Sequence, residues 1–446
     1  MIEIENLPGN RVLVFAPHND DEILGTAGAI QRYGEFGGQA HVAIMTNGDA
    51  QIRRPRRLPF FSPNFVNLGY RRQSESRKAL GYLGLPPERV HLLGYPDRGL
   101  DELWTDYWGY DNLYRSPYTK ADHSPYKDNY NPKAAYCGLS VLNDTKEVIR
   151  EVNPDVIFLP HPNDRHQDHW ATNGFATLAL LELQNEGYGW FRGVKLMSYL
   201  VHGVHFPYPR GEFLLASLTR PKTLEGLDTE WFLFPLSFTE RVRKLRAIGK
   251  YRSQTQLMRK YLVSFARANE LFGVVPELDL STVPELENPF RLSMDVVLEE
   301  ERETSFLSYL DPKSKSRLAT LKRYPDLRSV SLGRNNGNLE VLIQFYNVCG
   351  RNNEIKIIIK SVNRTGEAKD ASRSNTFVSK TDNLYVNGVQ VDKSSPYRYK
   401  RDRKSYSLSV PIEELRCPQK IILSITLGRN GVTFARSANR VIKLDR

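Results

Sequence analysis

The first part of the chain, up to about residue 272, alternates between short apolar runs and stretches whose apolar residues recur at helical intervals. The apolar runs are rich in β-branched and aromatic residues and predict five strands: Arg11–Ala16, Gln39–Met45, Arg89–Leu93, Asp155–Leu159 and Lys195–Val201. The spacing between them predicts four helices: 22–36, 71–83, 139–152 and 170–186. This alternation indicates an α/β fold with a mostly parallel sheet and helices on both faces, whose ligands bind at the carboxyl ends of the strands.

Between residues 100 and 137 the pattern is lost, and the segment is dense in Trp, Tyr, Asn, Asp and Pro. A loop of this length in a compact domain is usually functional or disordered, and its aromatic content argues against disorder. We predict a lid-like insertion that faces the substrate. A segment that wraps the domain for structural reasons is the alternative.

The composition changes again near Gly273, where three prolines punctuate a stretch without a clear period. Beyond it, short alternating runs predict strands at Leu339–Phe345, Ile355–Val362, Asn383–Val391, Tyr406–Val410, Lys420–Leu427, Val432–Ala435 and Val441–Leu444. Several short strands with turn residues between them are typical of a β-sandwich or jelly roll. We therefore predict a first domain over 1–273, a linker over 274–290 and an all-β sandwich over 291–446.

The composition is that of a globular protein: of 446 residues, 40% are hydrophobic and 25% charged. The apolar runs are strand-sized, which predicts no transmembrane segment, and the first residues do not resemble a secretory signal. Three cysteines without a CxxC pair exclude a disulfide framework and favour a cytoplasmic location. The oligomeric state stays open.

The charge is less ordinary, because 62 Lys and Arg against 51 Asp and Glu give a formal net charge of +11. Two segments are conspicuously basic, Arg53–Arg57 and Tyr397–Lys404. Nucleic acid, an anionic membrane surface or an acidic substrate are the partners that such a charge suggests. No nucleic-acid-binding motif accompanies Tyr397–Lys404, so we predict no nucleic-acid partner and favour a solvated face there. Arg53–Arg57 lies near a strand end and could meet an acidic substrate group, with a solvated loop as the equal alternative.

Two segments carry the candidate chemistry. Ala16–Glu22 (APHNDDE) follows the first predicted strand and His161–His169 (HPNDRHQDH) the fourth, where an α/β sheet binds its ligands. Mixed His and Asp sets are ligands for Zn²⁺ or a similar divalent ion. A single Asp there is often only a helix N-cap, and a single His is more often hydrogen-bonded than a ligand. Two such segments at two strand ends favour the metal site.

These residues resemble the PIG-L/LmbE-like family of zinc-dependent N-deacetylases. The similarity extends to Thr46–Asp49, to Arg72 and Glu75 as an Arg-x-x-Glu pair, to Gly94–Asp97, and to Lys244, Ala247 and Tyr251–Gln254 in a downstream helix. The resemblance covers about residues 10–272. It implies a Rossmann-like fold and removal of an acyl group, usually acetyl, from an amino sugar. One departure is Asn19, which stands where the family often has Pro, and this puts the rigidity of the loop in doubt.

The resemblance also implies roles for individual residues. His18, Asp21 and His169 would bind zinc or another divalent transition metal, and Asp20 would be the general base on the metal-bound water. His166 would stabilise the tetrahedral intermediate, and Asp168 would orient His166. Whether Asp20 or His166 protonates the leaving amine stays open.

Other residues carry weaker predictions. Arg72, Asp97 and His202 are candidate substrate-binding residues, against an Arg72–Glu75 pair on a helix face and a turn at Asp97. His161 is a candidate partner of the ligands, with direct contact to the metal as the less favoured alternative. His123 and the insertion aromatics Trp104, Trp108 and Tyr110 could stack on sugar rings, with surface packing as the equal alternative.

The sequence thus predicts a hydrolase that removes N-acetyl from an amino sugar or an N-acetylglucosaminyl glycoconjugate. The same chemistry on another amino-sugar conjugate or an acylated glycopeptide is one alternative. A glycan-binding protein with a vestigial site is the other, and the complete set of candidate ligands disfavours it.

Overall fold

The computed structural model describes residues 1–50, 64–187, 189–281, 292–294, 296–297, 326–362, 373–392 and 394–444. The chain divides into two compact units. The first consists of Met1–Gln184 and Tyr188–Val275, and the second of Pro276–Arg446 with Asn185–Gly187. The predicted linker therefore straddles the division between units, although its residues 282–290 lie outside the described residues, as does the basic segment Arg53–Arg57.

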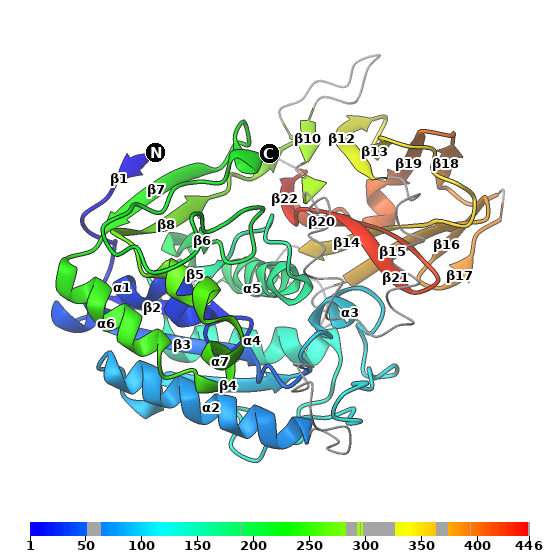
Figure 1. Ribbon diagram of the computed structural model, residues 1–446. Coiled ribbons are helices and arrows are strands. Elements are labelled where there is room, and N and C mark those ends of the chain that lie inside the picture. Colours follow the sequence, from blue (N-terminus) through cyan, green and yellow to red (C-terminus); the bar gives the residue numbers. More distant parts are fainter. Residues whose placement is uncertain are drawn as a thin grey trace. The chain divides into compact units, whose positions relative to one another are not determined.

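The first unit is built on an eight-stranded sheet in the order β1-β7-β8-β6-β5-β2-β3-β4 (Figure 1). Its strands are β1 (Ile2–Glu3), β2 (Arg11–Ala16), β3 (Gln39–Thr46), β4 (Val90–Tyr95), β5 (Val156–Pro160), β6 (Lys195–Tyr199), β7 (Glu230–Pro235) and β8 (Asn269–Val274). From β6 to β4 neighbouring strands are parallel, whereas β8 is antiparallel to both β6 and β7. Strand β2 pairs in parallel with β3 on one side and β5 on the other, so the order of the strands reverses between β2 and β5. Such a switch point separates the loops after the two strands and opens a crevice for ligands.

Helices cover both faces of this sheet. They are α1 (Asp21–Glu35), α2 (Phe65–Tyr82), α3 (Leu100–Thr105), α4 (Gly138–Val152), α5 (Gln167–Asn185), α6 (Phe238–Ile248) and α7 (Arg252–Leu262), with short 3-10 helices at Pro87–Arg89, Gly189–Gly193, Lys222–Leu224 and Val263–Phe265. Helix α6 contacts α1 and α2, α7 contacts α2, and α4 contacts β2 and β4.

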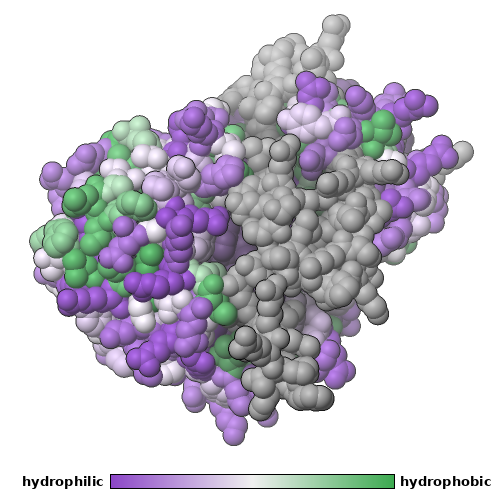
Figure 2. All heavy atoms as spheres, in the orientation of Figure 1, coloured by the Kyte–Doolittle hydropathy of each residue, from purple (hydrophilic) through white to green (hydrophobic). Residues whose placement is uncertain are grey.

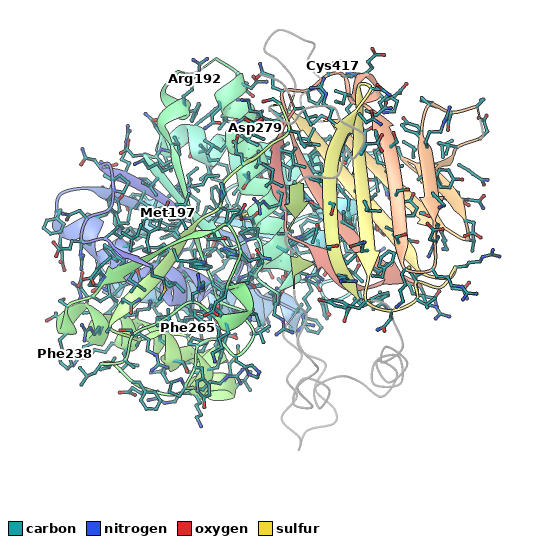
Figure 3. All side chains as sticks on the ribbon, turned by 90° about the horizontal axis from the view of Figure 1, so that it is seen from above. Arg192, Met197, Phe238, Phe265, Asp279 and Cys417 are labelled. Atoms are coloured by element: carbon teal, nitrogen blue, oxygen red, sulfur yellow. The ribbon has the colours of Figure 1, made fainter. Side chains whose placement is uncertain are left out.

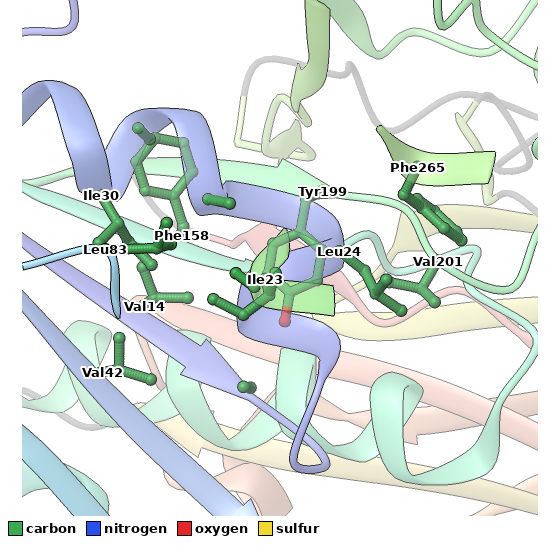
Figure 4. Packing of buried hydrophobic residues seen from close by; sticks show 14 of the residues in the cluster. Val14, Ile23, Leu24, Ile30, Val42, Leu83, Phe158, Tyr199, Val201 and Phe265 are labelled. Atoms are coloured by element: carbon green, nitrogen blue, oxygen red, sulfur yellow. The ribbon is translucent and has the colours of Figure 1, made fainter. Parts of the chain in front are cut away.

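The core explains this layering. Successive strand residues point to opposite faces, and Val12 and Val14 of β2 belong to the cluster that includes Ile23 of α1. Figure 4 shows Val14, Val42 and Phe158 of three neighbouring strands packed with Ile23 and Ile30 of α1. Residues Leu13 and Phe15 are equally buried but lie outside that cluster, as expected for the other face.

The predicted fold class is confirmed. All five predicted strands and four predicted helices occur near the expected bounds, although α2 begins at Phe65, six residues before the expected start. Strands β7 and β8 were not expected. They extend the sheet as an antiparallel pair. This arrangement depends on contacts between segments that are distant in the sequence.

The insertion 100–137 begins with α3 and continues without regular structure except for a bridge between His123 and Ala135. Trp104 is fully buried and packs edge-on against Phe175 and Trp108. The hypothesis that Trp104 stacks on a sugar ring is therefore wrong, because its ring belongs to the protein core. His123 lies in an exposed part of the insertion beside Asp122, and Tyr110 is 54% exposed.

The second unit contains two β-sheets. One has the order β10-β12-β13-β19-β18, formed by Leu292–Met294, Leu327–Asn335, Asn338–Phe345, Ser405–Pro411 and Arg398–Arg401. The other has the order β11-β21-β20-β14-β15-β16-β17, formed by Val296–Val297, Val432–Ser437, Lys420–Arg429, Glu354–Val362, Arg373–Lys380, Asn383–Val386 and Val389–Gln390. In addition, β22 (Arg440–Lys443) pairs with β20, and β9 (Leu278–Asp279) pairs with β22. A 3-10 helix lies at Ile412–Leu415.

Alternation along the strands forms the core of this unit. Leu339, Val341 and Ile343 of one sheet share a buried cluster with Ile355 and Ile357 of the other. The turn between β16 and β17 is Asn387-Gly388, both with positive φ (51° and 82°), which a two-residue hairpin turn requires. The predicted β-sandwich is confirmed, and the basic segment Tyr397–Lys404 forms its edge strand β18 and the following turn.

Figure 2 shows one face of the molecule. It shows hydrophobic residues gathered around α6 on the first unit and mostly hydrophilic residues elsewhere on that face; Phe36 and Phe238 are among the exposed apolar side chains.

In Figure 3, Met197 and Phe265 lie inside the first unit and Cys417 lies at the periphery of the second. All three cysteines are free, with Cys417 exposed. None of the helices in the described ranges has the length and apolar character to cross a bilayer.

Candidate active site

The loops after β2 and β5 bring the predicted metal ligands together. Asp21 lies at the first position of α1, and its Oδ2 is 3.1 Å from His18 Nδ1 and 3.0 Å from His169 Nε2. All three side chains are buried. The structure therefore brings two imidazole rings, from segments about 150 residues apart, to the same carboxylate oxygen of Asp21.

These donors fit a divalent transition metal. His169 Nε2 is buried and has no hydrogen-bond partner in the described part of the chain, although Asp21 Oδ2 is 3.0 Å away. Zinc bonds of about 2.0–2.2 Å at tetrahedral angles place neighbouring ligand atoms about 3.3 Å apart, close to the observed spacing. Three overlapping groups of possible ligands occur here: His18, His166 and His169; Asp21, His169 and His202; and His18, Asp97 and Asp168.

Each histidine predicted to be a ligand has a carboxylate behind it. His18 Nε2 lies 3.1 Å from Asp168 Oδ2 and 3.4 Å from Asp97 Oδ1, while His169 Nδ1 lies 3.1 Å from Asp164 Oδ2. Such carboxylates fix the tautomer and the ring orientation of a metal-binding histidine. Sequence reasoning assigned Asp164 no role. Its position in the segment after β5, five residues before His169 in α5, was the one available signal.

The charges around these side chains favour a cation at this place. Burial alone would lower the pKa of His169, but Asp164 and Asp21 raise it to about 9. Burial opposes the shift at His18 too, yet Asp168 and Asp21 raise the pKa of His18 well above its usual value. Burial would raise the pKa of Asp21, which His169 and His18 nevertheless hold well below its usual range. The carboxylates thus stabilise positive charge, and a divalent ion supplies it without the two protons.

Asp20 has an unusual backbone. It occupies the N-cap position of α1 with φ 137° and ψ −29°, and its side chain makes no capping hydrogen bond. A non-glycine residue in such a conformation costs about 1–3 kcal/mol and persists only where its surroundings impose it. The N-cap interpretation of this aspartate therefore fails, and its carboxylate is left beside the ligand cluster, 3.5 Å from Arg72 Nη2. Burial raises the pKa of Asp20 to about 8, against the opposing effect of Arg72.

His166 lies next to the ligands without a strong carboxylate partner. Its ring centroid is 4.6 Å from that of His18, and its side chain is one quarter exposed. Asp168, which was expected to orient His166, has its Oδ2 4.0 Å from His166 Nδ1 but 3.1 Å from His18 Nε2. The backbone N–H groups of Arg98 and Leu100 also bind Asp168. The carboxylate is thus committed mainly to His18. Burial and the neighbouring histidines His18 and His202 lower the pKa of His166 well below its usual value.

Two of the predicted substrate-binding residues border the cluster. Asp97 Oδ2 accepts a hydrogen bond from Ala50 N at 2.8 Å, while its Oδ1 faces His18. The His202 ring lies 4.7 Å from that of His169, and its Nδ1 is 3.4 Å from the hydroxyl of Tyr261. Both residues therefore lie beside the predicted ligands, and their role in substrate binding stays a prediction.

Arg72 and His161 have different surroundings. The Arg72 guanidinium donates to the backbone oxygens of Gly48 and Asn19 at 2.9 and 2.7 Å, and it is Arg71 that pairs with Glu75. Arg72 therefore connects the loops after β2 and β3. His161 uses one ring nitrogen towards Thr229 Oγ1 (3.2 Å) and the other as acceptor from Asn163 N (3.1 Å), so it is a structural residue outside the ligand set.

One family model matches part of this chain. Residues 13–180 match the family model described as PIG-L: GlcNAc-PI de-N-acetylase, which confirms the resemblance for that segment. No curated protein matches the chain.

Similar solved structures share low identity and low TM-scores with this chain. A conserved protein from Thermus thermophilus is 21% identical over 57% of this chain and 85% of its own, with a TM-score of 0.35. N,N'-diacetylchitobiose deacetylase from Pyrococcus horikoshii is 19% identical over 60% and 84%, with a TM-score of 0.35. The 4-carboxy-2-hydroxymuconate hydratase GalB from Pseudomonas putida is 18% identical over 60% and 98%, with a TM-score of 0.37.

Proposed function

Because residues 13–180 form a PIG-L domain, we propose that this chain is a metal-dependent hydrolase that removes the acetyl group from an amino sugar or an N-acetylglucosaminyl glycoconjugate. The observation that carries the proposal is the position of Asp20. Its buried carboxylate caps no helix and lies beside two imidazoles and a carboxylate that converge on one point. A structural role requires neither feature.

His18, Asp21 and His169 would hold the metal, with zinc as the expected ion. A bound zinc ion lowers the pKa of its water towards about 7 and polarises the amide carbonyl. Asp20 then accepts the proton of the attacking water and holds the proton that the departing amine requires. A general base works best with a pKa near the working pH, and burial moves the pKa of Asp20 in that direction.

His166 is the donor for the oxygen that becomes negative. Its pKa is lowered, so the ring is neutral, and its Nδ1 accepts a hydrogen bond from Asp168 N at 3.3 Å. This assigns the ring hydrogen to Nε2, which leaves Nε2 as a hydrogen-bond donor. A donor placed where charge develops stabilises the transition state.

The test is acetate release from a panel of N-acetylated sugars, with zinc content measured on the same preparations. The panel includes an acylated glycopeptide, because the amide of another conjugate is the nearest alternative substrate. Asp20→Asn should lower kcat by about 10²- to 10⁴-fold and leave the zinc content unchanged. Asp155→Asn is the matched control, since Asp155 is a distant carboxylate that binds the backbone of Asn10 and Arg11. Normal turnover by Asp20→Asn would refute the role of Asp20, and zinc-loaded protein inactive on the whole panel would refute the function.

A further inference from the structure

We propose that Tyr251 and Ser76 are positioning residues that hold Asp20 in its strained orientation, Tyr251 acting through Glu22 and Ser76 through Asn19. The inference rests on the proposed function, in which Asp20 is the base. It adds residues from α7 and α2, far from Asp20 in sequence, to the requirements of the reaction.

The backbone of Asp20 is the starting point. Its φ of 137° lies in a region that L-residues rarely adopt, so neighbouring groups must impose it. Its carbonyl oxygen accepts from Ile23 N and Leu24 N at 2.9 Å each, and its N–H donates to Glu22 Oε2 at 2.9 Å. The carbonyl contacts belong to the first turn of α1. Of these three backbone contacts, the one with Glu22 is supplied by a side chain.

Tyr251 fixes that side chain. Glu22 is completely buried, and its second oxygen, Oε1, accepts a short hydrogen bond from the Tyr251 hydroxyl. A buried carboxylate is costly unless its oxygens have donors, so the hydroxyl determines where the Glu22 carboxylate lies. Tyr251 is itself 1% exposed and immediately precedes α7. The chain of contacts therefore runs from α7 through Glu22 to the peptide of Asp20.

Asn19 restrains the peptide on the other side. Its Nδ2 donates to Ser76 Oγ at 3.0 Å, and its carbonyl oxygen accepts from Arg72 Nη2 at 2.7 Å. Arg72 and Ser76 are one helical turn apart on α2 and so face the same way. Hydrogen bonds to α2 thus supply the restraint that a proline ring at this position would provide covalently.

The two helices act as one support. Glu75 of α2 accepts hydrogen bonds from both the N–H and the hydroxyl of Ser253 in α7, at 2.9 and 2.6 Å. This contact joins the helix that carries Ser76 to the helix that follows Tyr251. A change in either helix is therefore transmitted to the loop that ends at Asp20.

The test is Tyr251→Phe in the full-length, zinc-loaded protein, because phenylalanine keeps the buried ring and removes only the hydroxyl. We expect kcat to fall about 10- to 100-fold, with KM and zinc content unchanged, since the metal ligands keep their contacts. Ser76→Ala should lower kcat in the same way and by less. The matched control is Tyr33→Phe, which also removes a tyrosine hydroxyl. Tyr33 lies at the end of α1 far from Asp20, and its hydroxyl donates to the backbone oxygen of Pro8. This variant should leave kcat unchanged.

A crystal structure of Tyr251→Phe separates this inference from the proposed function. If positioning is correct, Asp20 leaves its positive φ in the variant, whether or not the wild-type protein deacetylates any sugar. An unchanged φ together with an unchanged kcat would overturn the inference. A loss of zinc from Tyr251→Phe would also overturn the inference, because the fall in kcat would then come from the metal ligands and not from Asp20. If Tyr251→Phe does not fold, Ser76→Ala provides the same measurements.

Discussion

Two pairs of histidines in the first unit are about equally close and behave in opposite ways. The ring centroids of His18 and His169 are 5.3 Å apart, and those of His41 and His91 are 5.6 Å apart. The pKa of His18 and that of His169 are raised. Burial, His91 and two arginines lower the pKa of His41 to about 4, and burial lowers the pKa of His91.

The difference lies in what stands behind the rings. His41 and His91 lie on β3 and β4 within the sheet, where their strand partners include the apolar Leu13 and Ala43. His18 and His169 lie beyond strand ends. There, Asp168 Oδ2 lies 3.1 Å from His18 Nε2, and Asp164 Oδ2 lies 3.1 Å from His169 Nδ1. Proximity of histidines therefore does not define a metal site. A metal site is distinguished by carboxylates that orient the histidine rings and stabilise positive charge.

The largest expected effect is on metal content. His169→Ala should weaken zinc binding by more than about 100-fold, because losing a direct ligand costs more than losing an outer partner. His91→Ala, which removes a ring from the other pair, should bind zinc as the wild type does. Elemental analysis after zinc loading and dialysis measures both. Undiminished zinc in His169→Ala, or in the equivalent His18→Ala, would refute the ligand set.

A smaller effect is expected from the carboxylate alone. Asp164→Asn keeps the size of the side chain and removes the charge behind His169, so zinc affinity should fall by about 10- to 100-fold. Competition with a chelating dye gives the affinity. Asp155→Asn again serves as the control. Equal affinities for Asp164→Asn and the wild type would show that the carboxylate does not distinguish the two pairs of histidines.

The smallest effect concerns stability in acid. His41 stays neutral in the folded protein down to a pKa of about 4, whereas in the unfolded chain it is protonated below its usual 6.5. The unfolded state thus binds more protons between these values, and stability falls as the pH drops from about 6.5 towards about 4. The Tm should therefore fall less between pH 7 and pH 5 in His41→Gln than in the wild type.

The control for that measurement is His123→Gln, since His123 lies half exposed on the insertion. It should follow the wild type at both pH values. An identical fall of Tm in His41→Gln and the wild type would mean that the second pair of histidines contributes nothing to acid sensitivity.

Much of the fold was predictable because its signals are local. The five parallel strands and the helices between them follow from the period of apolar residues, which depends on backbone geometry alone. The position of both polar segments after strands placed them at one edge of the sheet before any contact was known. Trp104 shows the limit of this reasoning. The aromatic residues of the insertion suggested that Trp104 stacks on a sugar ring. Its packing against Phe175, about 70 residues away, makes it part of the core instead.

Within the site, the sequence by itself determined the donors, their order and their attachment to strand ends. It did not determine which carboxylate stands behind which histidine: Asp168 faces His18, 150 residues away, more closely than His166, two residues away. Nor did it determine the conformation of Asp20, where Glu22 is held by Tyr251 across 229 residues. Local periodicity arises from the sterics of each residue, whereas these contacts exist only after α1, α2 and α7 pack around one sheet. Only the tertiary structure could therefore decide them.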